Sequence, residues 1–186
     1  ILRYASLIDV VTHKNNQYTL TKKGRLLLKD EPRSLYRGIL LLGSEPWQRS
    51  WQNLSYSLTT GQSAFDQVFG SPFFDYLDEH SEYGIPFHQN MTSSTASVVQ
   101  AIVEAYDFSP FQNICDIGGG QGILLKHILQ SYPQLKGILY DQEKALKETV
   151  FKDSNEQIEI QSGDFFTSVP EADVLLLKNI LHDWNN

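Results

Sequence analysis

The sequence predicts an α/β fold in which a parallel, doubly wound sheet follows a helical region. The first observation is a change of pattern near residue 109. Before it, apolar residues recur mainly at helical spacing, and after it strand-like and helix-like runs alternate. The second observation is the order of those runs, which are NICDI, QGILLKHILQSYP, LKGILYD, KALKETVFK, IEIQSGD and ADVLLLKN. Alternating strands and helices form parallel sheets, because each helix carries the chain back to start the next strand in the same direction.

Length and composition are those of a globular protein. The chain has 186 residues, of which 41% are hydrophobic, and its 12 glycines bring it near the globular average. No apolar run approaches the roughly 18 residues of a membrane span, so we expect no membrane partner. The single cysteine, Cys115, lies in an apolar run and is expected to be a buried small hydrophobe. One cysteine cannot form an internal disulfide, which fits a reducing, cytoplasmic setting.

Residues 1–40 predict a winged-helix-like region. The stretch LRYASLIDVV has helical spacing, YTLT follows the polar turn HKNNQ as a short strand, and TKKGRLLLKDEP begins a second helix. These 40 residues carry eight basic and three acidic side chains, whereas the remainder carries seven and nineteen. This asymmetry leaves a winged-helix DNA-binding regulator as an alternative function. Because the whole chain has a net charge of −7 and its first helix has only Arg3 as a basic group, we expect no nucleic-acid partner.

Residues 41–108 predict a helical linker that covers the substrate. Helices are expected over SEPWQRSWQNLSYSLTTG, SPFFDYLDEH and NMTSSTASVVQAIVEAYDF. Two aromatic clusters lie in the first two of these stretches, Trp47 with Trp51 and Phe73 with Phe74 and Tyr76. We interpret both as helix core rather than as a substrate wall.

The densest motif is the glycine-rich turn between the first strand and the following helix. It reads Asp116-Ile117-Gly118-Gly119-Gly120-Gln121-Gly122, a D-x-G-x-G-x-G pattern. Glycines there permit positive φ and let a ligand approach the backbone, and the helix start offers unpaired N–H groups. A nicotinamide fingerprint would need glycine where Ile123 stands. The acid at Asp116 would repel a pyrophosphate and suits a ligand with a cationic centre and ribose hydroxyls.

Two further acids follow the next two strands. A carboxylate at Asp141 can accept both hydroxyls of a ribose, and one at Asp164 can accept from an adenine amino group, with Phe165 against the ring. Each feature alone is also typical of a tight turn or a helix cap. Acids at the ends of three successive strands, together with the glycine turn, favour a nucleoside ligand at the carboxyl edge of the sheet. S-adenosylmethionine is the favoured ligand, ahead of NAD.

These stretches resemble the S-adenosylmethionine-dependent O-methyltransferases of the caffeate and hydroxyindole type, including bacterial small-molecule members. The matching stretches are ILRYASLIDVV, YTLTKKGRLL, FDQVFGSPFFDYL, DIGGGQG, YD, SGDFF and LLKNILHDW, and the last is the most specific. The resemblance implies a Rossmann-like methyltransferase sheet with S-adenosyl-L-methionine as cofactor and S-adenosyl-L-homocysteine as product. The cofactor contacts it implies are Gly118, Gly120, Asp141, Asp164, Phe165 and Lys178. It implies His182 as catalytic base, and a helix bearing Met91 and Thr95 that reaches substrate and cofactor.

We add Asp116 and Thr95 to the cofactor contacts, and assign Met91 and Trp184 to the substrate. The family often has Leu-Pro after the ribose acid, where this chain has Gln142-Glu143, so the adenine wall is expected to differ. Family members begin earlier, with helices that form a dimer, and continue past His-Asp-Trp. We therefore expect a fragment or visible part of a longer enzyme, homodimeric at full length, in which 109–186 form a cofactor domain truncated after the fourth strand.

The resemblance implies that His182 removes a proton from a substrate hydroxyl. A phenol has a pKa near 10, and a neutral imidazole, with a pKa of about 6.5, can accept its proton at neutral pH. We expect Asp183 to point elsewhere, and the orienting carboxylate to lie beyond Asn186. The alternatives are a strand-end histidine packed on Trp184 and a solvated Lys178. The histidines show no metal-binding spacing, so we expect no metal.

The predicted activity is therefore methyl transfer to a hydroxyl of a small aromatic molecule. The aromatic side chains and Met91 of the helical layer favour a flat, apolar substrate. Beside the DNA-binding regulator, a nicotinamide dehydrogenase and a catalytically inactive cofactor-binding fragment stay open as alternatives.

Overall fold

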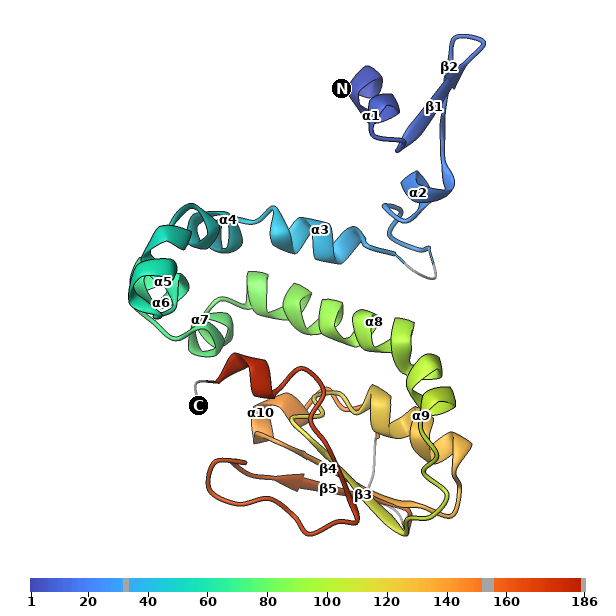
Figure 1. Cartoon of the computed structure of the whole chain (residues 1–186), viewed down its shortest axis with the longest axis vertical. Helices are drawn as coiled ribbons and strands as arrows, with labels where there is room; N and C mark the ends of the chain where they lie inside the picture. Colours follow the sequence, from blue (N-terminus) through green and yellow to red (C-terminus); the bar gives the residue numbers. More distant parts are fainter. Residues whose placement is uncertain (32–33, 152–155, 185–186) are drawn as a thin grey trace. The chain divides into compact units, whose positions relative to one another are not determined.

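The computed structural model describes residues 1–31, 34–151 and 156–184 and divides the chain into two compact units, Ile1–Ser93 and Ser94–Asn186 (Figure 1). The described residues of the first unit form helices and a two-stranded hairpin, and the second unit contains the parallel sheet. Within the described residues, no helix is both long and apolar enough to cross a membrane.

The first unit starts with the predicted helix, strand pair and helix. These are α1 (Leu2–Leu7), β1 (Val11–Lys14), β2 (Gln17–Leu20) and α2 (Lys22–Arg25). Asn15 and Asn16 turn the hairpin with φ of 51° and 60°, a conformation that asparagine tolerates better than most residues. Thr21 caps α2, because its Oγ1 accepts a hydrogen bond from Gly24 N at 2.9 Å.

Short helices and one long helix make up the remainder of the first unit. They are α3 (Tyr36–Leu42), α4 (Glu45–Gln52), α5 (Leu54–Thr60), α6 (Ala64–Phe69), α7 (Phe73–Glu79) and α8 (Ser81–Ala105), and α8 continues into the second unit. Gly61 and Gly70 end α5 and α6 in the left-handed conformation, with φ of 72° and 70°. Gly61 ends the helix predicted over residues 44–61 at its expected end, whereas Asn53, with φ of −101° and ψ of 18°, divides that stretch into α4 and α5.

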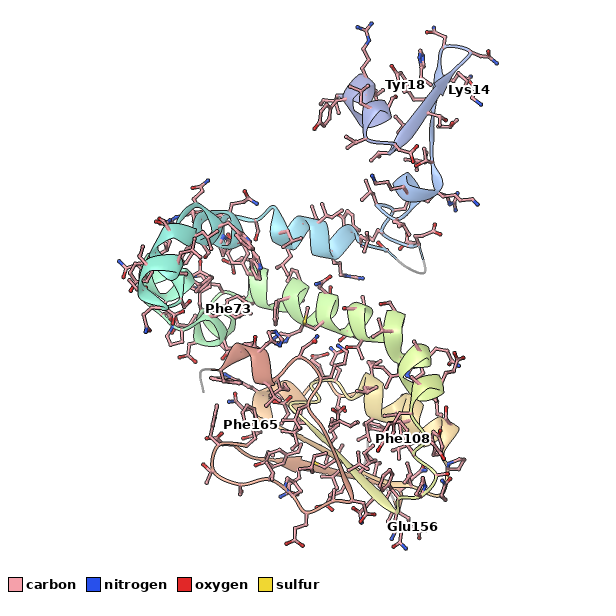
Figure 2. All side chains as sticks on the ribbon, viewed as in Figure 1. Lys14, Tyr18, Phe73, Phe108, Glu156 and Phe165 are labelled. Carbon is pink, nitrogen blue, oxygen red and sulfur yellow. The ribbon has the colours of Figure 1, made fainter. Side chains whose placement is uncertain are left out.

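The aromatic side chains of the first unit pack mainly on one another. Phe73, which is labelled in Figure 2, lies among these rings. It makes edge contacts with Trp47 at 5.5 Å and with Phe65 at 5.0 Å between ring centroids. This confirms the helix-core interpretation for Trp47 and Phe73. The interpretation is wrong for Trp51, whose side chain is exposed, because it lies on the solvent side of α4.

The second unit is built on a four-stranded, all-parallel sheet. Its strands are β3 (Asn113–Ile117), β4 (Lys136–Asp141), β5 (Ile158–Ser162) and β6 (Val174–Leu176), in the order β5-β4-β3-β6. The register places Cys115 beside Ile138 on β4 and beside Leu175 on β6. The strand order reverses between β3 and β6, and ligands of open α/β sheets bind at the carboxyl ends of strands flanking such a reversal. The predicted fold class is confirmed.

Two apolar clusters hold this sheet. On one face, Ile114 and Leu139 pack with α9 (Ile123–Ser131) and with apolar residues of α8 and α10 (Glu143–Leu146). On the other face lies a smaller cluster of Cys115, Ile117 and Tyr140. Cys115 is fully buried, and burial raises the pKa of its thiol to about 12, which confirms its prediction as a buried small hydrophobe.

The helix predicted over KALKETVFK is shorter than expected. Its described part, α10, ends at Leu146, and residue 152 lies outside the described residues. The chain beyond α10 bonds instead to the glycine turn, where the Gln121 carbonyl accepts from Val150 N at 2.9 Å and from Thr149 Oγ1 at 3.2 Å. Tertiary hydrogen bonds here replace the local helical ones.

Candidate cofactor and active site

The glycine turn joins β3 to α9 and has three residues in the left-handed region. Gly118, Gly120 and Gly122 have φ of 65°, 56° and 81°, a conformation that L side chains rarely adopt. A Cβ at Gly118 would collide with the Ile180 side chain, whereas no described atom lies within 4 Å of a Cβ built at Gly120. Gly120 is thus the point of the turn where a ligand can approach the backbone.

Asp141, at the end of β4, is bonded to this turn. Its Oδ2 accepts a hydrogen bond from Gly120 N at 2.8 Å, and its Oδ1 accepts from Gln142 N at 2.7 Å. The fold therefore brings together two predicted site residues that are 21 positions apart. A carboxylate oxygen can accept more than one hydrogen bond, so the same group can also bind ligand hydroxyls.

Asp116 lies behind the turn rather than on its surface. Its side chain is only 2% exposed, and among the described residues its Oδ2 has no hydrogen-bond partner. Burial, and then the charge of Asp141, raise the pKa of the Asp116 carboxyl to about 7, while a backbone hydrogen bond from Leu125 and the charge of Lys178 oppose the shift. The expected direct contact of Asp116 with a cationic ligand does not suit this buried position.

The Asp116 carboxyl group also explains why residue 119 is a glycine, although the D-x-G-x-G-x-G pattern does not require one there. Gly119 has an ordinary φ, but a Cβ there would stand 2.8 Å from the Asp116 carboxyl carbon and 2.6 Å from a Leu139 methyl. The turn passes so close above Asp116 that only glycine fits.

Asp164 and Phe165 lie in the segment that follows β5. The Asp164 carboxylate accepts from Phe166 N at 2.9 Å, and its backbone oxygen accepts from Thr167 N and Ser168 N, so the residue shapes a tight turn. The half-buried Phe165 ring packs against the cluster of Cys115, Ile117 and Tyr140. Asp164 is exposed at the surface of the turn, where a ligand can reach it.

The chain beyond β6 turns sharply and carries the remaining predicted residues. Lys178 is half-buried, and burial lowers the pKa of its amino group while the charge of Asp116 raises it. Asn179 has φ of 59°, and a 3₁₀ turn, η1 (Leu181–Asp183), follows. Trp184 makes edge contacts with Phe166 at 4.8 Å and Phe165 at 5.9 Å between centroids.

The expectation that Asp183 points away from His182 is wrong. His182 Nε2 lies 3.1 Å from Asp183 Oδ1, and both side chains reach solvent, with exposed fractions of 67% and 33%. That expectation rested on the two residues being adjacent in sequence, and neighbouring side chains point in opposite directions in an extended chain. In a 3₁₀ turn successive side chains are about 120° apart, so neighbours can converge.

Met91 and Thr95 lie four residues apart along α8, and both side chains are half-buried. The unit boundary passes between them, with Met91 in the first unit and Thr95 in the second. Within the described part of the chain, no three His, Cys, Asp or Glu side chains gather closely enough to hold a metal ion.

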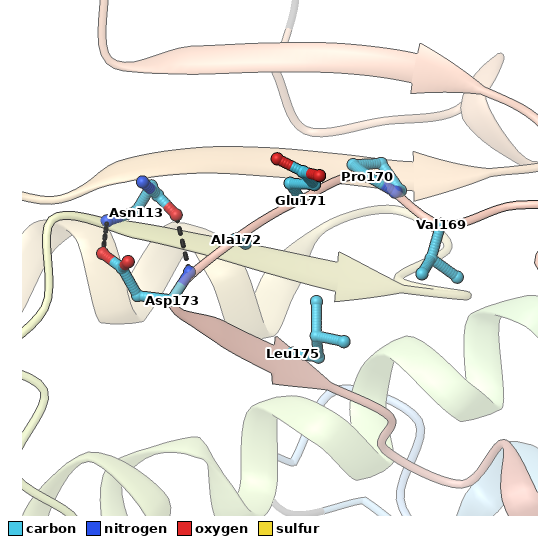
Figure 3. Close-up of a pocket in the computed structure, with 7 residues that line it drawn as sticks. All are labelled: Asn113, Val169, Pro170, Glu171, Ala172, Asp173 and Leu175. Carbon is cyan, nitrogen blue, oxygen red and sulfur yellow. Dashed lines mark hydrogen bonds between the residues drawn. The ribbon is translucent and has the colours of Figure 1, made fainter.

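A hollow of about 640 Å³ lies beside β6, between the segment 169–173 that leads into this strand and the starts of β3 and β6 (Figure 3). It is lined by Asn113, Val169, Pro170, Glu171, Ala172, Asp173 and Leu175. Asn113 and Asp173 hold each other there: the Asp173 carboxylate accepts from Asn113 N at 3.1 Å, and Asn113 Oδ1 accepts from Asp173 N at 2.7 Å (Figure 3). These bonds fix where β3 and β6 begin.

Comparison with known proteins shows the family. The model of the O-methyltransferase domain matches residues 51–186. The chain belongs to this O-methyltransferase family. A phenazine O-methyltransferase of Lysobacter antibioticus is 35% identical over 192 residues, which cover 100% of this chain and 56% of the relative. An O-demethylpuromycin-O-methyltransferase of Streptomyces alboniger is 35% identical over 177 residues, covering 91% of this chain and 47% of the relative.

Solved structures of the family agree with the fold. The structure of LaPhzM has a TM-score of 0.84 and 36% identity, covering 99% of this chain and 57% of that one. CalO1, a methyltransferase in calicheamicin biosynthesis solved with S-adenosylhomocysteine bound, has a TM-score of 0.83 and 30% identity, with coverage of 99% and 56%. Human N-acetylserotonin methyltransferase, solved with S-adenosylmethionine, has a TM-score of 0.82 and 26% identity, and the match covers 99% of this chain and 56% of that one. The chain thus spans about half the length of the relatives it matches.

Proposed function

We propose that the protein is an S-adenosylmethionine-dependent O-methyltransferase that methylates a hydroxyl group of a small aromatic molecule. The observation that carries the proposal is the junction of Gly120 and Asp141 at the carboxyl edge of the sheet. There an acid that can hold ribose hydroxyls is bonded to a glycine whose surface is open to a ligand. CalO1 and the human enzyme, which share the fold and the family, were solved with S-adenosylhomocysteine and S-adenosylmethionine respectively.

The residues at this edge fit the cofactor. Asp141 would hold the ribose, the turn at Gly118 and Gly120 would lie against the ligand, and Asp164 with Phe165 would bind the adenine. Lys178 and Thr95 complete the proposed contacts. Asp116 would act indirectly, since its buried carboxyl supports the turn from behind. When bound, the cofactor supplies an electrophilic methyl group.

His182 is the proposed general base. The contact between its Nε2 and the Asp183 carboxylate would stabilise the tautomer with the proton on Nε2, which leaves Nδ1 to accept the proton of the substrate hydroxyl. Proton removal makes the oxygen a better nucleophile and contributes roughly 10²–10⁴-fold to the rate. Met91 and Trp184 are the proposed substrate contacts.

The aromatic substrate class rests on the apolar side chains of the helical region and on the names of relatives. Among these are a phenazine O-methyltransferase and a 3-amino-4-hydroxybenzoate 4-O-methyltransferase, each 35% identical to this chain. A homodimer of the full-length protein and a cytoplasmic location stay predictions.

The test is transfer of labelled methyl from S-adenosylmethionine to a panel of hydroxylated aromatics, namely phenazines, hydroxybenzoates and hydroxyindoles. We expect label on the oxygen of at least one class, and loss of transfer in His182→Ala. Label only on amines or on protein would contradict the substrate class. Binding of S-adenosylhomocysteine without any transfer would identify an inactive cofactor-binding protein instead.

A further inference from the structure

The segment Gly163–Ser168, here named the 163–168 loop, is fixed to β4 at both of its ends. At its start, Gly163 N donates to the Asp141 backbone oxygen at 3.0 Å. At its end, the Ser168 backbone oxygen accepts from the Tyr140 hydroxyl at 2.7 Å. Between these anchors lie Asp164 and Phe165, the proposed adenine contacts.

Tyr140 is an unusual anchor because it is almost fully buried. Its residue is 2% exposed and belongs to the cluster with Cys115 and Ile117, against which Phe165 also packs. Tyr140 and Asp141 are neighbours on a strand, so their side chains point to opposite faces of the sheet. One end of β4 thereby supports two parts of the site: Asp141 holds the glycine turn, and Tyr140 holds the 163–168 loop.

The backbone of the 163–168 loop packs directly against the Tyr140 ring at Gly163. A Cβ at Gly163 would collide with the Tyr140 hydroxyl and stand 2.6 Å from each of two carbons of its ring. Gly163 has no positive φ in this structure, so its glycine is required by space alone. The Tyr140 ring therefore sets how closely the loop can approach the sheet, and its hydroxyl sets where the loop ends.

We propose that Tyr140 is a positioning residue for adenine recognition. Its buried side chain holds the 163–168 loop in place, and this loop carries the proposed adenine contacts. The proposal rests on the proposed function, since it takes Asp164 as the acceptor of the adenine amino group. Without the hydroxyl, the Ser168 oxygen loses its partner inside the protein and the loop can shift. The Asp164 carboxylate then meets the amino group in poorer geometry, although the remainder of the cofactor site is unchanged.

The test compares Tyr140→Phe with Tyr132→Phe. Tyr132 is a matched control, because its hydroxyl also donates to a backbone oxygen of the second unit, that of Tyr106 at 3.4 Å, away from the loop. Two quantities are measured: amide hydrogen exchange of residues 166–168 without ligand, and the ratio of affinities for S-adenosylhomocysteine and S-inosylhomocysteine. The second ligand differs in replacing the amino group of adenine by an oxygen.

We expect faster exchange of residues 166–168 in Tyr140→Phe and about 3–10-fold weaker binding of S-adenosylhomocysteine, as for one lost hydrogen bond. Binding of S-inosylhomocysteine should change less, so the ratio of the two affinities falls. Tyr132→Phe should keep the wild-type exchange rates and ratio. Gly163→Ala, which keeps the tyrosine but pushes the loop away from it, should reproduce the lower ratio.

The outcomes separate the two proposals. A wild-type protein that binds S-adenosylhomocysteine, combined with an unchanged ratio in Tyr140→Phe and Gly163→Ala, would overturn the role of Tyr140 alone. A wild-type protein that does not bind S-adenosylhomocysteine would overturn the proposed function, and this proposal with it. Equal weakening of both ligands would show that Tyr140 acts on general stability, and would also overturn the positioning role.

Discussion

The two edges of the parallel sheet shift the pKa of a carboxyl group in opposite directions. At the amino edge, Asp173 accepts from Gln112 N at 2.9 Å and from Asn113 N at 3.1 Å, and these hydrogen bonds lower the pKa of its carboxyl. At the carboxyl edge, burial raises the pKa of Asp116 to about 7, and Asp116 Oδ2 has no hydrogen-bond partner among the described residues. The carboxylate at the amino edge is stabilised by hydrogen bonds, whereas the carboxyl group at the carboxyl edge is buried with one oxygen that has no hydrogen-bond partner among the described residues.

The strained and unsatisfied groups of the sheet gather at its carboxyl edge. The hollow of about 640 Å³ is lined by the hydrogen-bonded Asp173 and by the segment that precedes it, and by none of the proposed cofactor residues (Figure 3). The three left-handed glycines of the β3–α9 turn, the left-handed Asn179 and the buried Asp116 all lie at the carboxyl edge. Strained backbone and unsatisfied polar groups are typical of functional sites, and here they lie outside the lining of the hollow.

The largest effect is expected at His182. We predict that His182→Ala lowers turnover by about two to four orders of magnitude while cofactor affinity is kept, because the proposed cofactor contacts are other residues of the edge. The remaining activity should climb toward the pKa of the phenol, near 10, since only pre-ionised substrate would react. Asp183→Asn should lower turnover less. Near-normal turnover of His182→Ala at pH 7 would contradict the role of the histidine.

Asp116 should make stability depend on pH. The folded protein holds its proton up to about pH 7, whereas an unfolded aspartate loses its proton near pH 4. The folded state therefore binds more protons between these values, and the free energy of unfolding should fall by about 2–3 kcal/mol from pH 5 to pH 8 through this group. Urea unfolding should show that fall in the wild type and a flatter profile in Asp116→Asn. Identical profiles would refute the assignment.

The glycines at Gly118 and Gly120 offer a matched pair. Both have positive φ, so alanine at either should cost about 1 kcal/mol of stability. Gly118→Ala should cost more, because its Cβ collides with Ile180, whereas a Cβ at Gly120 projects into open space. Gly120→Ala should instead keep the fold and weaken S-adenosylhomocysteine binding. Calorimetry that shows full affinity in Gly120→Ala would place the ligand elsewhere.

The smallest effect is expected at the amino edge. Asp173→Ala should slightly lower the melting temperature and leave ligand affinity unchanged. Because the pKa of Asp173 is lowered by folding, its contribution is present above about pH 4 and is lost as the pH falls through the lowered value. The difference in melting temperature between variant and wild type should therefore shrink in acid. A loss of S-adenosylhomocysteine binding in Asp173→Ala would remove the contrast between the edges.

Local pattern was enough to predict the sheet and most positions along its carboxyl edge. Strands that end in Asp116, Asp141 and Gly163-Asp164 must meet at one edge of a parallel sheet, so their grouping followed from alternation alone. The hydrogen bond from Gly120 to Asp141 is the contact that this grouping implies.

What the sequence could not show are the contacts that depend on how closely segments approach. Three such features depend on contacts between segments that are distant in the chain. They are the burial of Asp116, the close approach of Tyr140 to Gly163 and the close approach of Ile180 to Gly118. A glycine that is needed for space looks the same in the sequence as one needed for positive φ. The contact of His182 with Asp183 was missed for another reason, since the sequence did not predict the 3₁₀ turn in which these adjacent side chains converge.

We propose above all that the carboxyl edge binds the cofactor through Asp141. Calorimetric titration of the wild-type protein, Asp141→Ala and Asp173→Ala with S-adenosylhomocysteine tests it most directly. We predict binding by the wild type, unchanged binding by Asp173→Ala, and a loss of roughly 1.5–3 kcal/mol in Asp141→Ala, as for hydrogen bonds to a charged group. Equal affinity of Asp141→Ala and the wild type, or no binding by the wild type, would contradict the claim.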